Sequence, residues 1–157
     1  MDLTPLPVTH RALIPDAYLD EMGHMNVMWY THLFSRGAWG LFQMVGLNRD
    51  YFAANQAGSF ALEQHFRYLK EIRVGESITI QSRVLGRTAK RWHLMHFMTL
   101  DVNGALAATS ECVHAHSDMC TRRTSSMPSP ICEAIDRLLA EHSRLPWDAP
   151  RCQALSP

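Results

Sequence analysis

Hydrophobic positions fill one long segment of the chain almost without interruption. Between residues 27 and 47 the only charged residue is Arg36, and apolar residues fall on nearly every helical face. Such a segment predicts a long helix that is enclosed by other structure. Gly37 and Gly40 would let a sheet approach the helix backbone closely, and Gly46 would end the helix.

The segments around this helix alternate between apolar and polar residues. An extended segment, residues 8–18, precedes the helix. Downstream, the alternation predicts antiparallel strands over residues 59–72, 76–87, 91–102 and 105–118. The pair Asn103-Gly104 predicts a tight hairpin turn between the last two strands.

A second helix is predicted near the end of the chain, over about residues 129–143. Ser129 would cap it, with Pro130 at its first position, and its single apolar stripe indicates a surface helix. The last dozen residues are expected to form a loosely ordered tail. The order of elements predicts an α+β fold in which an antiparallel sheet wraps around the long central apolar helix. We expect one domain over residues 1–157, with its core at about 8–118.

Composition narrows the class of protein. The chain has 157 residues, 46% hydrophobic and 19% charged, so it can bury a core as a single domain. A formal net charge of +0 gives no long-range attraction for nucleic acid or an anionic membrane. The four cysteines form no CxxC pair, and neither a signal peptide nor a membrane span is evident. We therefore expect a cytoplasmic protein with reduced thiols.

The sheet would leave an edge or a face that the one-sided second helix does not cover. Native proteins cover such edges, and pairing with another copy is a common way to do so. We therefore expect a homodimer or homotetramer.

The stretch DEMGHMNVMWY, residues 20–30, places an acid, a turn and the start of the long helix in succession. The pattern D-x-x-G-H-M-N, with Tyr30 four residues after the Asn, resembles the hotdog-fold acyl-CoA thioesterases of the 4-hydroxybenzoyl-CoA thioesterase-like family. The resemblance runs from about Arg11 to His116. Residues 65–97 are especially similar to small bacterial thioesterases associated with carnitine and betaine breakdown.

This resemblance implies a hydrolase that acts on acyl-CoA. Asp20 would attack the thioester carbonyl as a nucleophile or activate a water as a base. The first backbone N–H groups of the long helix, near Val27, would bind the thioester oxygen. A helix N-terminus suits this role because its first N–H groups lack partners and carry partial positive charge.

Other residues of the motif match the family's substrate-binding positions. Gly23 would allow the tight turn, and Tyr30 matches the aromatic residue of the helix. His24 could be a catalytic partner, a substrate contact or a turn residue. Asn26 is also the predicted cap of the long helix. Glu63, on the strand after the helix, could face the substrate as a second acid or lie in solvent.

The basic turn that contains Arg87, Lys90 and Arg91 occupies the place where the family contacts the phosphates of coenzyme A. Lys and Arg suit such phosphates, although a basic turn can also be simply solvated. Coenzyme A would be part of the substrate, so no cofactor is expected. The nine histidines form no convincing set with a carboxylate or a cysteine, and no metal site is predicted.

The sequence departs from the family pattern at Met22 and Val27, where many members have Asn. Two alternatives to hydrolysis follow from the same fold. Some hotdog proteins are acyl-thioester hydratases or dehydratases, and others bind acyl-CoA without catalysis. Only a thioesterase would release free thiol from acyl-CoA.

Overall fold

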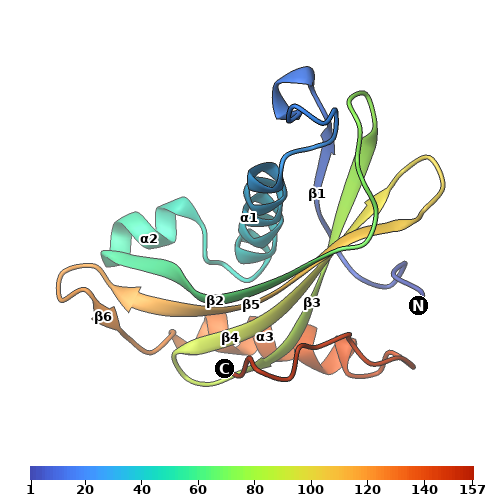
Figure 1. Ribbon diagram of the computed structural model, residues 1–157. Coiled ribbons are helices and arrows are strands. Elements are labelled where there is room, and N and C mark those ends of the chain that lie inside the picture. The colour runs from blue at the N-terminus through green and yellow to red at the C-terminus, as the bar shows by residue number, and fades with distance from the viewer.

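The structure, a computed structural model, describes residues 1–157. A curled antiparallel sheet with three α-helices makes up the fold, which is α+β (Figure 1). The strands are β1 (Val8–Leu13), β2 (Ala57–Tyr68), β3 (Ser77–Arg87), β4 (Arg91–Leu100), β5 (Leu106–Asp118) and β6 (Arg123–Thr124). The helices are α1 (Val27–Met44), α2 (Arg49–Asn55) and α3 (Ser129–His142), with a 3-10 turn at Asp16–Tyr18.

The strands follow the order β1-β3-β4-β5-β2, and the short β6 also pairs with β5. Every pairing is antiparallel. A hairpin does join β4 and β5 and includes Asn103 and Gly104, the latter at a φ of 67°. Its loop is longer than the predicted two-residue turn, because β4 ends at Leu100, whose N–H bonds to the Ala105 carbonyl at 2.9 Å, and β5 begins at Leu106. The long β2 is left at the edge of the sheet.

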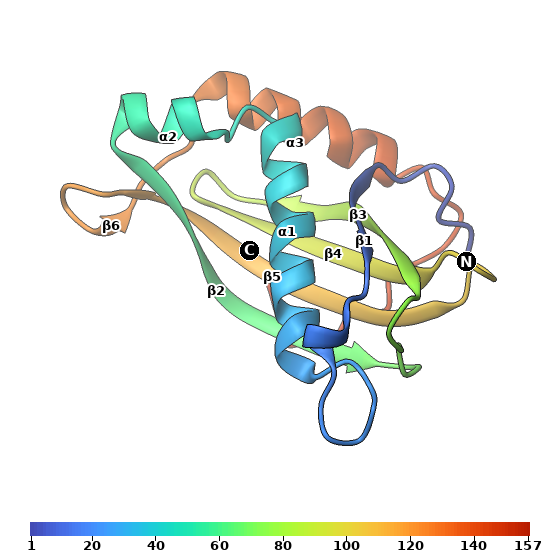
Figure 2. The same cartoon turned by 90° about the horizontal axis from the view of Figure 1, so that it is seen from above.

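Helix α1 lies across one face of the sheet, and α3 lies against the other (Figures 1 and 2). One stripe of α1 is buried against the sheet: Tyr30, Leu33, Phe34, Gly37, Ala38, Leu41 and Phe42. The opposite stripe is exposed: Val27, Met28, Thr31, His32, Ser35 and Arg36. The prediction of a helix enclosed on nearly every face is therefore not confirmed, because within one chain the sheet covers a single side.

The glycines of α1 allow the close approach that the sequence predicted. A Cβ atom on Gly40 would lie 2.0 Å from the backbone carbonyl oxygen of Thr9 in β1. A Cβ atom on Gly37 would lie 2.8 Å from a methyl carbon of Ile80 in β3. Glycine at these two positions thus sets how tightly α1 packs on the sheet.

Several local features differ from what the sequence predicted, and the strand predicted over 59–72 is one of them, because β2 ends at Tyr68. The first strand ends at Leu13 because Pro15 follows it and cannot donate to the ladder. The seven-residue α2, capped by the Asn48 side chain, was not predicted. Ser129 is not a cap, since α3 begins at Ser129 and its N-cap is Pro128.

The C-terminal tail is packed against the chain rather than loosely ordered. The Trp147 indole donates to the Asp2 carbonyl at 3.0 Å, and Arg83 donates to the Trp147 carbonyl at 2.9 Å. Arg83 also lies over the Trp147 ring, 4.4 Å from its centroid. No helix in the chain combines the length and the apolar character needed to cross a membrane.

Candidate active site

Asp20 lies in a tight turn that leads into α1. One carboxylate oxygen, Oδ1, accepts the backbone N–H of Met22 at 2.9 Å and of His24 at 3.3 Å. The Asp20 N–H donates to the His24 carbonyl at 2.9 Å, and Gly23 has a φ of 80°, which glycine adopts readily. These bonds fix the carboxylate of Asp20 while its second oxygen keeps no partner within the chain.

The start of α1 leaves one backbone donor free. The Asn26 side chain accepts the Met28 N–H at 3.0 Å, which confirms Asn26 as the N-cap, and the Trp29 N–H bonds to the Asn26 carbonyl at 2.9 Å. Val27 is the first residue of the helix, so its N–H has no intrahelical acceptor. The Val27 residue is 60% exposed. A free donor at the positive end of α1 can bind a developing oxyanion.

A shallow pocket of about 370 Å³ opens beside the start of α1, lined in part by Val27, Tyr30, Tyr68 and Lys70. Tyr30 is buried, and its hydroxyl donates to the Lys70 carbonyl at 3.4 Å. Burial raises the pKa of Tyr30 to about 12, so the phenol stays protonated at neutral pH. The Tyr68 ring packs edge-on against it at 5.0 Å.

The turn is tied to the loop after β2 by a contact between His24 and Glu71 that the sequence did not reveal. His24 Nε2 lies 2.8 Å from Glu71 Oε2, with side chains 39% and 47% exposed. The same Glu71 carboxylate accepts the Arg73 Nε–H at 3.0 Å. Glu71 is far from His24 in sequence, and only the fold brings the two together.

Glu63 lies on the edge strand beside a β-bulge. The bulge falls between Ala61 and Glu63, and Glu63 is paired with Val113 of β5. Paired residues point to the same face of a sheet, so Glu63 shares a face with Val113, whereas Ala61 and Gln64 line a cavity under α1. Glu63 is exposed and belongs to neither cavity.

In the basic turn between β3 and β4, Arg87 is paired with an acid, whereas Lys90 and Arg91 are not. Arg87 is held by two hydrogen bonds to the Asp136 carboxylate of α3, one of them 2.6 Å long. This pairing raises the pKa of Arg87 and lowers that of Asp136. Lys90 and Arg91 are exposed and line a shallow pocket of about 450 Å³ together with Thr124.

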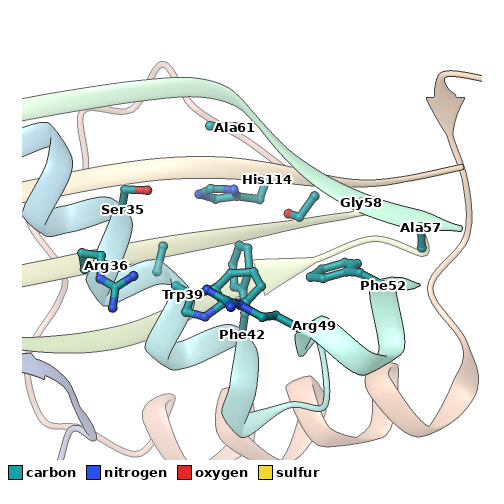
Figure 3. A pocket seen from close by; sticks show the side chains of 12 residues that line it. Ser35, Arg36, Trp39, Phe42, Arg49, Phe52, Ala57, Gly58, Ala61 and His114 are labelled. Carbon is teal, nitrogen blue, oxygen red and sulfur yellow. The ribbon is translucent and has the colours of Figure 1, made fainter. Parts of the chain in front are cut away.

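A larger cavity of about 600 Å³ lies between α1, α2 and the start of β2 (Figure 3). Its lining includes Arg36, Trp39, Phe42, Arg49, Phe52 and His114. The sequence alone did not indicate this cavity, because its residues come from four separate elements and follow no regular spacing along the chain.

A smaller cavity of about 150 Å³ continues beneath α1 and shares His114 with the larger one. It also reaches His96, whose Nδ1 lies 2.6 Å from the Ser82 hydroxyl. Burial lowers the pKa of His96 to about 3 and that of His114 to about 4. Both imidazoles are therefore neutral at physiological pH.

One group of side chains has donors that could hold a metal ion. The ligand atoms of His65, Glu111 and Cys152 lie within 4.8 Å of one another. The Glu111 carboxylate is already engaged, because it contacts His93 Nε2 at 2.8 Å and accepts the Cys152 N–H at 2.6 Å. The group includes none of the residues of the turn or of the cavities.

Comparisons with known proteins indicate the family of this chain. The thioesterase-like superfamily matches residues 14–135. The L-carnitine dehydrogenase/betainyl-CoA thioesterase of Agrobacterium fabrum is 33% identical over 84% of this chain, which spans only 27% of that relative. The betainyl-CoA thioesterase of Pseudomonas aeruginosa is 25% identical over 88% of this chain and 87% of its own length.

The fold also matches solved structures. A hypothetical protein from Staphylococcus aureus, solved in complex with CoA, superposes with a TM-score of 0.84 over 91% of this chain and 90% of its own. Its sequence is 24% identical, so the likeness concerns the fold alone. It supports the curled hotdog sheet and the α+β class that the resemblance implied.

Proposed function

This chain belongs to the thioesterase-like superfamily, and from that membership we propose that it is an acyl-CoA thioesterase, which releases free coenzyme A and a carboxylic acid. The observation that carries the proposal is the Asp20 carboxylate, fixed in the turn that leads into α1, together with the free N–H of Val27. Thioester hydrolysis needs a nucleophile or base and a donor for the oxyanion, and these two groups supply both.

Two routes give the same products. In the first, Asp20 Oδ2 attacks the carbonyl carbon, the thiolate of coenzyme A leaves, and water hydrolyses the resulting anhydride. In the second, Asp20 takes a proton from a water, whose oxygen attacks the carbonyl carbon directly; the C–S bond then breaks and the thiolate of coenzyme A leaves. In both, negative charge develops on the carbonyl oxygen, where the Val27 N–H would donate; one such donor is worth about 3 kcal/mol.

The neighbouring residues would position this chemistry. Gly23 and Asn26 shape the turn and the helix start, and Tyr30 closes the inner wall of the adjoining pocket. The contact with Glu71 holds the His24 ring beside the turn, so His24 would orient the loop or contact the substrate.

The basic turn would bind the phosphates of coenzyme A. Lys90 and Arg91 remain available for this, whereas Arg87 is tied to Asp136 and would contribute through its remaining donors. Glu63, exposed on β2, would reach substrate only where a second subunit covers this edge.

A second copy of the chain would cover that edge. β2 has twelve residues, and four large apolar residues on it or directly after it are exposed: Phe60, Leu62, Tyr68 and Leu69. An unpaired edge of this kind favours pairing. We expect a homodimer in which two β2 strands run antiparallel across a two-fold axis, with a dimer of dimers as the larger alternative.

This pairing would join two pockets from different subunits. In an antiparallel pair, the start of one β2 lies beside the end of the other. The end of β2, at Tyr68, lines the pocket at Val27, while its start, at Ala57, lines the larger cavity. The catalytic turn of one subunit would therefore face the larger cavity of the other.

Thiol release from a panel of acyl-CoAs tests the proposal. The panel contains straight-chain, aromatic and dicarboxylic acyl groups and, because of the names of the relatives, betainyl-CoA. We expect stoichiometric release of free thiol and carboxylic acid from at least one member. Hydration of an enoyl-CoA without thiol release would indicate the hydratase alternative, and CoA binding without any turnover would indicate a non-catalytic binding protein.

A further inference from the structure

The large cavity between α1 and α2 is positively charged. Arg36, the only charged residue of α1, and Arg49, the first residue of α2, both line it (Figure 3). Neither guanidinium belongs to an ion pair in the chain, and no aspartate or glutamate is among the twelve lining residues. Two unpaired arginines around one cavity favour an anionic group on a ligand.

The wall of this cavity is aromatic. The rings of Trp39 and Phe52 face each other at a centroid distance of 5.9 Å, and Phe42 adjoins Trp39 at 6.3 Å. At about 600 Å³ the cavity is within the range of small-molecule sites, whose walls are mostly apolar with a few polar groups. An apolar body with a polar end fits such walls.

The His114 side chain adds a buried polar group to the same cavity (Figure 3). The residue is 8% exposed, and neither ring nitrogen has a hydrogen-bond partner in the chain. The Phe42 ring packs edge-on against it at 5.1 Å and fixes its orientation. Buried polar groups are almost always satisfied, so a ligand oxygen or a water is expected at His114.

The distance along α1 places this cavity beyond the reach of a short acyl group within one chain. At 1.5 Å per residue, Arg36 lies roughly 14 Å and Trp39 roughly 18 Å along the helix axis from Val27. The proposed antiparallel pairing of β2 strands would bring the cavity of one subunit beside the Val27 of the other. The cavity is then positioned to receive the far end of an acyl group whose thioester lies at Asp20.

We propose that this cavity holds the terminal carboxylate of the acyl group, so that the preferred substrates are dicarboxylic acyl-CoAs; this inference rests on the proposed thioesterase function. Arg36 and Arg49 of one subunit pair with the carboxylate, the aromatic wall packs against the carbon chain, and His114 donates its N–H to a carboxylate oxygen.

The same charges disfavour a quaternary ammonium acyl group. An aromatic wall can bind such a cation on its ring faces. Here the cation would also meet two like charges with no carboxylate among the lining residues to offset them. The cavity therefore predicts that betainyl-CoA, the substrate in the names of the relatives, is a poor substrate for this chain.

The test compares acyl-CoAs that differ only in terminal charge. Glutaryl-, adipyl- and suberyl-CoA are each assayed against their monomethyl esters, with betainyl-CoA as the cationic member. We expect kcat/KM for the best carboxylate to exceed that of its ester at least tenfold. In the double variant Arg36→Gln/Arg49→Gln this ratio falls to about one, whereas the matched surface variant Arg137→Gln, on the exposed side of α3, keeps it.

Each other outcome has a definite meaning. An ester or betainyl-CoA hydrolysed as fast as the carboxylates would overturn the inference and leave the thioesterase function in place. Equal weakening of free-CoA binding and of all substrates in the double variant would assign the arginines to the phosphates of coenzyme A, which also overturns it. Absence of thiol release from these compounds and also from straight-chain and aromatic acyl-CoAs would instead refute the thioesterase function itself.

Discussion

Asp20 is both a turn residue and the proposed catalytic carboxylate. It is a turn residue, because one carboxylate oxygen accepts two backbone N–H groups of its own turn. The same bonds hold the second oxygen in a fixed place at the entrance to α1, which is what a catalytic carboxylate requires. The turn geometry thus supports the proposed chemistry rather than replacing it.

The cap of α1 provides a prediction at this scale. Asn26→Ala removes the acceptor for the Met28 N–H, so the free energy of unfolding should fall by about 1 kcal/mol. Urea unfolding at neutral pH measures the change. Asn26→Ser, which keeps a capping oxygen, should recover most of the loss, and equal stabilities for the Ala and Ser variants would contradict the role of the cap.

Residues were predictable where their chemistry is local. The tight turn at Gly23 and the Asn26 cap both depend on neighbours within a few positions. Glu71 and His114 were missed because only the fold positions them: Glu71 comes from the loop after β2 to the Asp20 turn, and His114 comes from β5 to the larger cavity. No single-sequence pattern encodes such distant contacts.

At the scale of elements, α1 shows what apolar content can and cannot predict. The run of apolar residues correctly predicted a long helix, and the β-strands followed from alternation. The apolar run did not indicate which face of the helix the sheet would cover. One side of α1 packs on the sheet, while Val27 and Met28 stay exposed. Exposed apolar residues on α1 and β2 indicate a surface that a second copy can bury.

The contact between α1 and β1 yields a prediction for an element. Gly40→Ala would place a methyl group 2.0 Å from the Thr9 carbonyl, so α1 and β1 must separate. Alanine is the better helix former by about 1 kcal/mol, but this overlap with rigid backbone should outweigh that gain and destabilise the fold by about 1–3 kcal/mol. Thermal unfolding would measure it.

Gln43→Ala is the matched control, since Gln43 lies on the exposed side of α1 near its end. It should leave the melting temperature unchanged or slightly raised. A Gly40→Ala protein as stable as the wild type would show that β1 does not constrain the helix.

For the whole molecule, buried histidines make stability depend on pH. Burial lowers the pKa of His96 to about 3 and those of His114 and His142 to about 4, below the value near 6.5 of the unfolded chain. The free energy of unfolding is therefore highest above pH 6.5 and decreases as the pH falls toward 4. In this range these histidines take up protons in the unfolded chain but stay neutral in the folded chain. Each histidine contributes up to about 1.4 kcal/mol per pH unit.

Urea unfolding at pH 7 and pH 5 tests this dependence. The unfolding midpoint should fall at pH 5, and His114→Phe should reduce the slope by up to about one proton. A midpoint that does not change between these two pH values would show that the buried histidines are not neutral in the folded chain.

The proposed pairing of β2 strands between two subunits predicts complementation between variants. Asp20→Asn removes the catalytic carboxylate, and Arg36→Gln/Arg49→Gln removes the proposed carboxylate site. Each proposed site is composite, because it combines Asp20 of one subunit with the large cavity of the other. In a mixed dimer of these two variants, one composite site therefore contains both sets of substitutions and the other contains none. Mixed dimers should therefore regain about half of the wild-type kcat on a dicarboxylic acyl-CoA, although each variant alone is poor.

Differently tagged copies, refolded together and purified through both tags, would give the mixed dimer. If each site lay within a single chain, both sites would carry one lesion and the activity would stay low. That result, or a monomer in light scattering, would contradict the composite site.

The central claim is that Asp20 performs thioester hydrolysis, and one measurement tests it most directly. Thiol release from the best acyl-CoA is followed for wild type, Asp20→Asn and Asp16→Asn, the last a nearby exposed acid outside the turn. We expect kcat to fall roughly 100-fold or more for Asp20→Asn, with Asp16→Asn unchanged. Full activity in a folded Asp20→Asn protein would contradict the account and place the chemistry on another residue.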